Sequence, residues 1–250
     1  MILCIGPTPA EQRVMVFRTL ILNEVNRATT TLDGPAGKST NVAKALAALG
    51  ERPVATGFLG GTRGERLRKA LEARGIGHDF SEAGQTRQCV TVIDESNGTQ
   101  TELVEESQPI AVADYDRLEG IVRDRVKDCR AVIMSGTLTP GGPVDFYFRC
   151  TQLANSAGAL SVVDAHGVPL IEAIRARPGI VKPNRLELAS TLGLELGAES
   201  SLISAMRELH ERGAERVVVT AGKQPSLAFD GRVLWRILPP RRQPLSRRRV

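Results

Sequence analysis

The chain has 250 residues, of which 42% are hydrophobic and 24% charged, a composition typical of a globular protein with one large domain. Its formal net charge is +5, but removing the six arginines between residues 236 and 250 leaves 27 basic against 28 acidic residues. The excess positive charge therefore belongs to the C-terminal segment, and it argues against nucleic-acid binding by the rest of the chain.

The N-terminus and the cysteines narrow the class of protein further. Residues 1–6 are apolar but lack the basic region of a signal peptide, so we predict a buried first strand. No apolar run is long enough for a transmembrane helix. Cys4, Cys89, Cys129 and Cys150 have no metal-ligand spacing, and we interpret them as small buried residues in a reducing cytoplasm.

The predicted elements alternate between strand and helix along the chain. Short, nearly continuous apolar runs predict strands that are buried on both faces, at residues 1–6, 54–59, 131–135, 160–164, 179–182 and 216–220. Amphipathic segments predict helices at residues 40–49, 63–74, 114–126, 144–157, 184–192 and 199–212. This alternation predicts an α/β fold with a doubly wound, mostly parallel sheet flanked by helices.

Two stretches depart from this rhythm. Residues 12–33 and 87–104 carry alternating β-type apolar residues without a helical period. Asn97-Gly98, inside the second stretch, is a strong signal for a β-hairpin. We therefore predict that both stretches form a small secondary sheet outside the main one.

Small or polar residues follow several of the predicted strands. These residues are Ser135-Gly136, Asp164, Lys182-Pro183-Asn184 and Thr220-Ala221-Gly222. In open parallel sheets ligands bind beyond the carboxyl ends of the strands, so this pattern indicates a ligand crevice. Gly136 and Gly222 would allow the backbone to approach phosphate groups closely.

A glycine-rich loop, residues 34–41, opens the helix predicted at residues 40–49. Its spacing is not that of a P-loop, because Leu32 stands five positions before Gly37, where the P-loop has glycine. Glycines, a lysine and free N–H groups at a helix N-terminus still suit an anionic or polyhydroxyl ligand. The alternative is an ordinary solvated helix cap.

These motifs, in this order, resemble the PfkB (ribokinase-like) family of carbohydrate kinases. The matching segments are Gly37-Lys38-Ser39-Thr40-Asn41-Val42-Ala43, Phe58-Leu59-Gly60-Gly61, Thr86-Arg87, Thr101-Glu102 with Glu105, Ser135 to Gly141, Asp164 with Gly167, Lys182-Pro183-Asn184 with Glu187, and Val219 to Gly222. They span residues 1 to about 238 and are most similar to the 1-phosphofructokinase and tagatose-6-phosphate kinase subgroup.

The resemblance implies a ribokinase-like domain over residues 1–238, with a β-sheet lid formed by about residues 12–33 and 87–108. It implies transfer of a phosphoryl group from ATP, with Mg²⁺, to a sugar phosphate. The residues that it assigns to the sugar phosphate are Gln12, Gly37, Lys38, Asn41, Arg87 and Glu102. Those that it assigns to the nucleotide are Lys182, Asn184, Glu187, Thr220 and Gly222, with Asn184 and Glu187 acting on Mg²⁺ through the phosphates.

Three of these residues have plainer interpretations. Arg87 could be a solvated charge, although an arginine suits bidentate binding of a phosphate. Glu187 lies three residues after Asn184 and could simply complete a capping box at a helix start. Asp164 could position only its loop, and we leave it out of the catalytic residues.

The chain departs from the family at Gln12. The family's early N-P-A-x-D motif ends in an aspartate that holds sugar hydroxyls, whereas here Thr8-Pro9-Ala10-Glu11 is followed by Gln12. An amide can still form hydrogen bonds, but it lacks the charged acceptor. Glu11 cannot replace the aspartate, because neighbouring residues of a strand point to opposite faces.

The second departure concerns the family's G-[AS]-G-D segment, whose aspartate is the general base toward the substrate hydroxyl. The sequence contains no such segment. The arginine-rich composition after residue 238 is typical of out-of-frame translation, so we hypothesise a frameshift or premature stop, with residues 239–250 outside the fold. We therefore assign no catalytic residue and expect impaired turnover.

Two other functions remain open. A remnant that keeps Lys38, Arg87 and Asn184 could bind sugar or nucleotide without catalysis. A nucleic-acid-binding protein could use the arginine tail, but Trp235 is the only tryptophan and no aromatic series accompanies the arginines. We expect a sugar phosphate and ATP as partners, neither nucleic acid nor membrane, and a homodimer formed through the lid.

Overall fold

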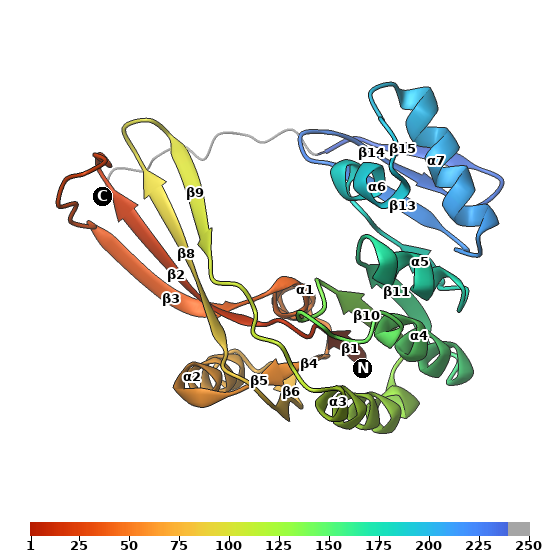
Figure 1. The fold of residues 1–250 in the computed structure, drawn as a ribbon, viewed down its shortest axis with the longest axis horizontal. Coiled ribbons are helices and arrows are strands. Elements are labelled where there is room, and N and C mark those ends of the chain that lie inside the picture. The colour runs from red at the N-terminus through yellow and green to blue at the C-terminus, as the bar shows by residue number, and fades with distance from the viewer. Residues whose placement is uncertain (240–250) are drawn as a thin grey trace.

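A nine-stranded, mostly parallel sheet forms the centre of the protein, which a computed structural model describes for residues 1–239 (Figure 1). The strand order is β15-β14-β13-β12-β11-β10-β1-β4-β6. The bounds are β1 Ile2–Ile5, β4 Pro53–Thr56, β6 Gly77–His78, β10 Ala131–Ser135, β11 Leu160–Asp164, β12 Ile180–Val181, β13 Val217–Ala221, β14 Gln224–Phe229 and β15 Leu234–Ile237. Two pairings are antiparallel, β13 with β14 and β14 with β15.

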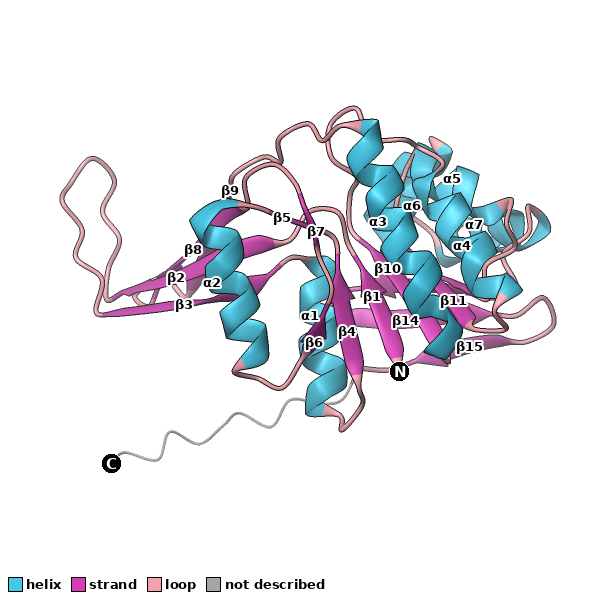
Figure 2. Cartoon of the chain, turned by 90° about the horizontal axis from the view of Figure 1, so that it is seen from below, coloured by secondary structure: helices cyan, strands magenta, loops and turns pink. Residues whose placement is uncertain are grey.

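Helices cover both faces of this sheet because its central strands are apolar on both sides. In β1, Ile2 and Cys4 join one core cluster, and Leu3 and Ile5 join the other. The first cluster packs against α1 (Lys38–Ala48) and α2 (Gly61–Glu72). The second packs against α3 (Val112–Arg125), α4 (Phe146–Ser156), α5 (Val168–Ile174), α6 (Arg185–Leu192) and α7 (Glu199–Glu211), which Figure 2 shows grouped together. Full burial of a side chain such as Leu3 contributes roughly 1.5–3 kcal/mol.

A separate four-stranded sheet forms the lid and projects from the body (Figure 1). Its order is β3-β2-β8-β9, with bounds β2 Ala10–Phe17, β3 Thr30–Ala36, β8 Arg87–Asp94 and β9 Thr99–Val104. The hairpin predicted at Asn97-Gly98 joins β8 to β9. Asp94 closes this turn by accepting hydrogen bonds from Ser96 and Asn97, and the hydroxyl of Ser96 is the main cause that lowers the pKa of Asp94 to about 2.

The predicted strands and helices are confirmed, with the following differences. The strand predicted at residues 54–59 is divided at Gly57 into β4 and β5 (Phe58–Leu59), and β5 pairs with β7 (Ser81–Glu82). The two-residue strands β6 and β7, the short helix α5 and the pair β14–β15 were not predicted. All four residues of β15 are exposed, and Arg236 interrupts its apolar residues Leu234, Trp235 and Ile237. Apart from Pro239, the basic segment predicted at residues 239–250 lies outside the described residues.

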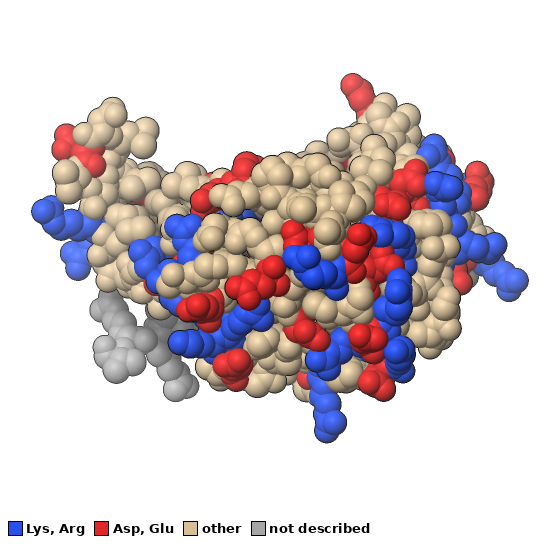
Figure 3. All heavy atoms as spheres, turned by 60° about the horizontal axis from the view of Figure 1, so that its bottom comes forward, with Lys and Arg blue, Asp and Glu red and all other residues tan. Residues whose placement is uncertain are grey.

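The surface of the described part has no single dominant charge on the face drawn in Figure 3. There, Lys and Arg side chains are interspersed with Asp and Glu side chains. Many of them form ion pairs, such as Arg123 with Glu119 and Arg125 with Asp79. Among residues 1–239, no helix has both the length and the apolar character needed to cross a membrane.

Candidate functional site

The polar residues predicted at the strand ends contact one another at the carboxyl edge of the sheet. The Ser135 hydroxyl donates to Asp164 Oδ2 at 2.9 Å, and Lys182 Nζ lies 3.1 Å from Asp164 Oδ1. The N–H of Gly136 donates to the carbonyl of Asp164. Asp164 is therefore a buried carboxylate that joins the ends of β10, β11 and β12.

A hollow of about 360 Å³ lies beside this carboxylate, between the loop at residues 136–144 and the loop at residues 165–169. Two buried tyrosines hold the first loop in place. Tyr147 donates its hydroxyl to the carbonyl of Gly136, and Tyr115 bonds to both the hydroxyl and the N–H of Thr139. Such contacts fix a loop before any ligand arrives and lower the entropic cost of binding.

The glycine-rich loop enters α1 without a side-chain cap, so the first N–H groups of the helix are available to a ligand or to water. Gly37 has φ +103°, and a Cβ atom there would lie 2.8 Å from Cα of Pro9. Only glycine therefore fits. The preceding strand β3 is a largely exposed edge strand of the lid, unlike the buried strand that precedes a P-loop.

Lys38 and Glu187 connect the start of α1 to the start of α6. Lys38 Nζ lies 2.8 Å from Glu187 Oε1. Glu187 also completes the capping box, because its Oε2 accepts from the N–H of Asn184 while Asn184 Oδ1 accepts from the N–H of Glu187. The capping interpretation is thus confirmed, and the same carboxylate reaches Lys38 as well.

The ionisation of Glu187 follows from these contacts. Burial favours the neutral acid, but the hydrogen bond from Asn184 and the charge of Lys38 favour the carboxylate more strongly. The pKa of Glu187 therefore lies below its usual value. A negative charge at the start of α6 also suits the positive end of the helix dipole.

The residues predicted to bind the nucleotide are also neighbours. Asn184 forms an isolated parallel bridge with Thr220, whose N–H donates to the carbonyl of Pro183. Gly222 has φ +61° in the turn between β13 and β14. The ends of β12 and β13 thus lie side by side.

Arg87 stands at the base of the lid with an unneutralised charge. Its Nη2 donates to the carbonyl of Thr8 at 3.2 Å, and its Nη1 to the carbonyl of Glu105 at 3.3 Å. Its Nε is buried and has no hydrogen-bond partner among residues 1–239, and none of the carboxylates in that range forms an ion pair with it. An arginine in this condition suits an anionic ligand.

Thr8 links Arg87 to the crevice. Its hydroxyl donates to the carbonyl of Thr137, and a Cβ on Gly136 would lie 3.9 Å from that hydroxyl and 3.7 Å from Cβ of Lys38. Since Lys38 contacts Glu187, a continuous series of contacts runs from Arg87 to Asn184. Arg87, Lys38, Glu187 and Asn184 thus lie along one edge, whereas no contact in this series includes Gln12, Asn41 or Glu102.

The two faces of the lid differ: one carries Gln12, and the other lies against α2. Gln12 pairs with Cys89 in register and donates to the hydroxyl of Thr91, which in turn lies opposite Glu102. Glu11 points to the other face, toward α2. The argument that Glu11 cannot stand in for Gln12 is therefore confirmed. No described side-chain hydrogen bond or ion pair joins the exposed Asn41 or Glu102 to the other candidates, although the N–H of Asn41 donates to the carbonyl of Gly37.

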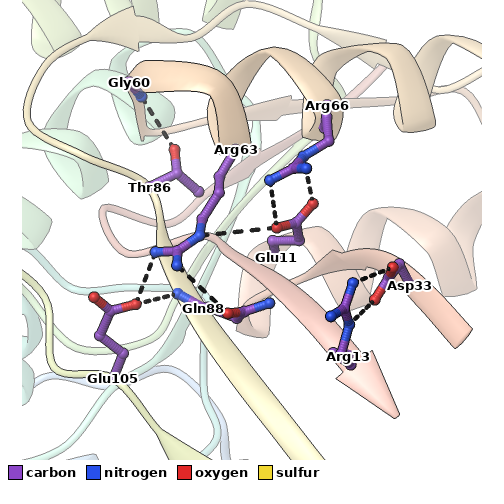
Figure 4. Close-up of polar contacts among 9 residues, drawn as sticks. All are labelled: Glu11, Arg13, Asp33, Gly60, Arg63, Arg66, Thr86, Gln88 and Glu105. Carbon is purple, nitrogen blue, oxygen red and sulfur yellow. Dashed lines mark hydrogen bonds and ion pairs between the residues drawn. The ribbon is translucent and has the colours of Figure 1, made fainter. Parts of the chain in front are cut away.

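Sequence reasoning missed two groups of residues. The first is Thr8, whose backbone carbonyl accepts a hydrogen bond from Arg87. A pattern of side chains in the sequence does not reveal such a contact. The second is the charged network behind the lid shown in Figure 4, formed by Glu11, Arg63, Arg66, Gln88 and Glu105. Charged residues on an exposed helix such as α2 normally indicate only a solvated face.

A parallel sheet with glycine-rich loops and several cations at its carboxyl edge, flanked by a β lid, defines an α/β protein suited to phosphorylated ligands. The sequence profile described as "pfkB family carbohydrate kinase" matches residues 1–246. The chain belongs to this family of carbohydrate kinases.

Solved structures share the fold. Phosphofructokinase-2 from Escherichia coli in its tetrameric inhibited form is 27% identical, with a TM-score of 0.88 over 97% of this chain and 80% of that chain. The same enzyme in complex with fructose-6-phosphate gives 27% identity and a TM-score of 0.85 over the same shares. A protein described as a possible 1-phosphofructokinase from Thermotoga maritima is 26% identical, with a TM-score of 0.86 over 94% of this chain and 76% of that chain.

Glu187 provides a test of this geometry. Glu187→Ala removes both the capping contact and the ion pair, so it should lower the free energy of unfolding by about 1–2 kcal/mol. Glu187→Gln keeps a capping acceptor and should cost only about 0.5 kcal/mol. Urea denaturation at pH 7 measures both changes, with the exposed Glu195→Gln as a control that should change nothing.

The effect should depend on pH. Because the pKa of Glu187 is lower in the folded than in the unfolded state, its carboxylate stabilises the fold fully above the unfolded value of about 4.3. That stability is lost as the pH falls through the lower folded value. The gap between wild type and Glu187→Gln should therefore narrow below about pH 4, and a gap that widens there contradicts the assignment.

Proposed function

We propose that this family member phosphorylates a sugar phosphate with ATP, as a 1-phosphofructokinase or a tagatose-6-phosphate kinase does. The observation that carries the proposal is Arg87, a half-buried arginine that has no carboxylate partner among residues 1–239 and lies at the edge shared with Lys38. A sugar-phosphate kinase needs a cation for the phosphate of its sugar substrate, in addition to the groups that bind the phosphates of ATP, whereas a kinase for free sugars does not. The relative crystallised with fructose-6-phosphate supports the same class of substrate.

The sugar phosphate would lie between the lid and the start of α1. Its binding residues are then Gln12, Gly37, Lys38, Asn41, Arg87 and Glu102. Gln12 already donates to Thr91, which leaves its carbonyl oxygen to accept from a sugar hydroxyl. A neutral acceptor discriminates hydroxyl groups less strongly than a carboxylate would.

The nucleotide would lie over the ends of β12 and β13. Its contacts are then Lys182, Asn184, Glu187, Thr220 and Gly222. The residues present fit Mg²⁺ held through phosphate oxygens and water, because Asp164 and Glu187 supply carboxylate oxygens at the same edge, each next to a lysine that a phosphate group could take over. When bound, the ion would neutralise charge on the phosphates.

A polypeptide of these 250 residues has no G-x-G-D segment, so we propose that this polypeptide turns over slowly. Gln12, which stands in place of the family's aspartate, also supports slow turnover. The second candidate function is therefore a non-catalytic protein that binds the sugar phosphate or the nucleotide. A binding measurement and a turnover measurement together separate the two functions.

Replacement of Arg87 tests the substrate class. Arg87→Ala should weaken binding of the sugar phosphate about 10–100-fold, because charge-assisted hydrogen bonds contribute about 1.5–3 kcal/mol each. Calorimetric titration with fructose 1-phosphate, fructose 6-phosphate and tagatose 6-phosphate measures this, with MgADP as the ligand that should be unaffected. Arg18→Ala, an exposed arginine just beyond β2, is the matched control. Equal affinity of wild type and Arg87→Ala for all three sugars contradicts the proposal.

Turnover of the 250-residue polypeptide should be at least about 100-fold below the 1–100 per second typical of kinases, because a general base contributes roughly that much. A coupled assay for ADP release with the same three sugars measures it. Tight binding with no ADP release supports the non-catalytic function. Rapid ADP release shows that the 250 residues suffice for catalysis and refutes the impairment.

We also propose that two copies associate through their lids. Large apolar side chains of the lid region are exposed in a single copy, and a second copy could cover them. They are Ile21, Leu22, Val25, Leu32, Leu103 and Val104. The Escherichia coli relative is described as tetrameric. Light scattering should show a dimer that Leu32→Glu dissociates, while Leu186→Glu, at a more exposed position outside the lid, leaves it intact. A monomer at every concentration contradicts this proposal.

A further inference from the structure

A network of two carboxylates and two arginines ties the back of the lid to α2 (Figure 4). Arg66 binds both oxygens of Glu11, with Nε 2.9 Å from Oε1 and Nη2 3.2 Å from Oε2. Arg63 lies beside it, with its Nε 3.9 Å from Glu11 Oε2. Glu11 is 9% exposed, so its charge depends on these two partners far more than on water.

Arg63 has further partners on the lid. Its Nη1 donates to Glu105 Oε2 at 3.0 Å, and its Nη2 to Gln88 Oε1 at 3.4 Å. Glu105 Oε2 also accepts from the N–H of Gln88 at 2.7 Å. One guanidinium thus contacts β2, the start of β8 and the residue just beyond β9, which are three separate segments of the lid.

The network reaches Arg87 through its immediate neighbours. The Glu105 side chain is held by Arg63, while the Glu105 backbone carbonyl accepts from Arg87 Nη1. Gln88, the next residue after Arg87, is held by both Arg63 and Glu105. On the other side, Thr86 accepts a hydrogen bond from the N–H of Gly60 at the start of α2. Arg87 is therefore tethered to α2 on both sides.

Successive side chains of a lid strand point to opposite faces, so the contacts with α2 also affect the ligand face. Glu11 and Gln88 pair in register and point toward α2, so their neighbours Gln12 and Arg87 point to the opposite face. A contact that fixes the first pair of residues also fixes the direction of the second pair. The back of the lid thereby determines the geometry of its ligand face.

We propose that Arg63 is a positioning residue that holds the Gln88–Glu105 segment against α2 and thereby sets the guanidinium of Arg87 for a phosphate group. The phosphate role rests on the function proposed above, whereas the anchoring itself does not. Arg63 touches neither substrate nor reacting atoms. Its effect should therefore appear in the affinity for phosphorylated sugars and in the exposure of the adjacent lid strand.

Binding measurements test the first consequence. Arg63→Ala should weaken binding of the sugar phosphate roughly tenfold and leave the dissociation constant for MgADP unchanged. In an Arg87→Ala background, titrated at millimolar sugar phosphate, the same change should have almost no further effect, because the residue that Arg63 positions is absent. Arg13→Ala is the matched control, because it breaks the Arg13–Asp33 ion pair on the same face of the lid without touching α2.

A thiol reaction tests the anchoring without any ligand. Cys89 is half-buried two residues from Arg87, whereas Cys4, Cys129 and Cys150 are buried. Arg63→Ala should raise the rate of alkylation of Cys89 by iodoacetamide at least about threefold, because a released segment opens more often, and Arg13→Ala should not. Mass spectrometry of the Cys89 peptide gives the rate.

The outcomes separate this inference from the proposed function. If the wild type binds no sugar phosphate, the proposed function fails and the alkylation rate alone decides the anchoring. An unchanged Cys89 rate in Arg63→Ala overturns the inference. It is also overturned if Arg63→Ala weakens sugar phosphate and MgADP equally, or if its effect adds in full to that of Arg87→Ala.

Discussion

The parallel pairing of buried strands is the constraint on which the candidate site depends. β1 pairs in parallel with β10 and β4, and β10, β11, β12 and β13 continue in the same direction. All their carboxyl ends therefore meet at one edge. Residues as distant in sequence as Lys38 and Glu187 come within 2.8 Å because every connection between the parallel strands includes a helix, which returns the chain to the opposite edge of the sheet.

Charge at this edge is shared between cations and carboxylates from different elements. Lys38 pairs with Glu187, and Lys182 with Asp164, so neither lysine is left isolated in the crevice. A ligand with phosphate groups would compete with these carboxylates for the lysines. Arg87 differs, because its described partners are carbonyl oxygens, and an anion can approach it without displacing a carboxylate. Under the function proposed here, this difference would give Arg87 a larger share of phosphate binding than either lysine.

The lid uses the two faces of its strands for different purposes. The face with Gln12, Thr91 and Glu102 belongs to the candidate ligand site, and the face with Glu11 and Gln88 is bound to α2. A shift of one residue in register would exchange the two sets of side chains. The ion pairs to α2 therefore stabilise one register and one orientation of the lid at the same time.

The sequence by itself determined the α/β alternation, the lid and most of the candidate residues, because buried parallel strands leave continuous apolar runs and the loops after them carry short, ordered motifs. It also placed Glu11 and Gln12 on opposite faces, since alternation in a strand is a local property. The strand β15 was not predicted, because Arg236 interrupts its short apolar run. Only the tertiary structure decided that Lys38 reaches Glu187, that the carbonyl of Thr8 holds Arg87, and that Arg63 joins three lid segments. Those contacts link residues far apart in the chain, and no local pattern records which distant charges will meet.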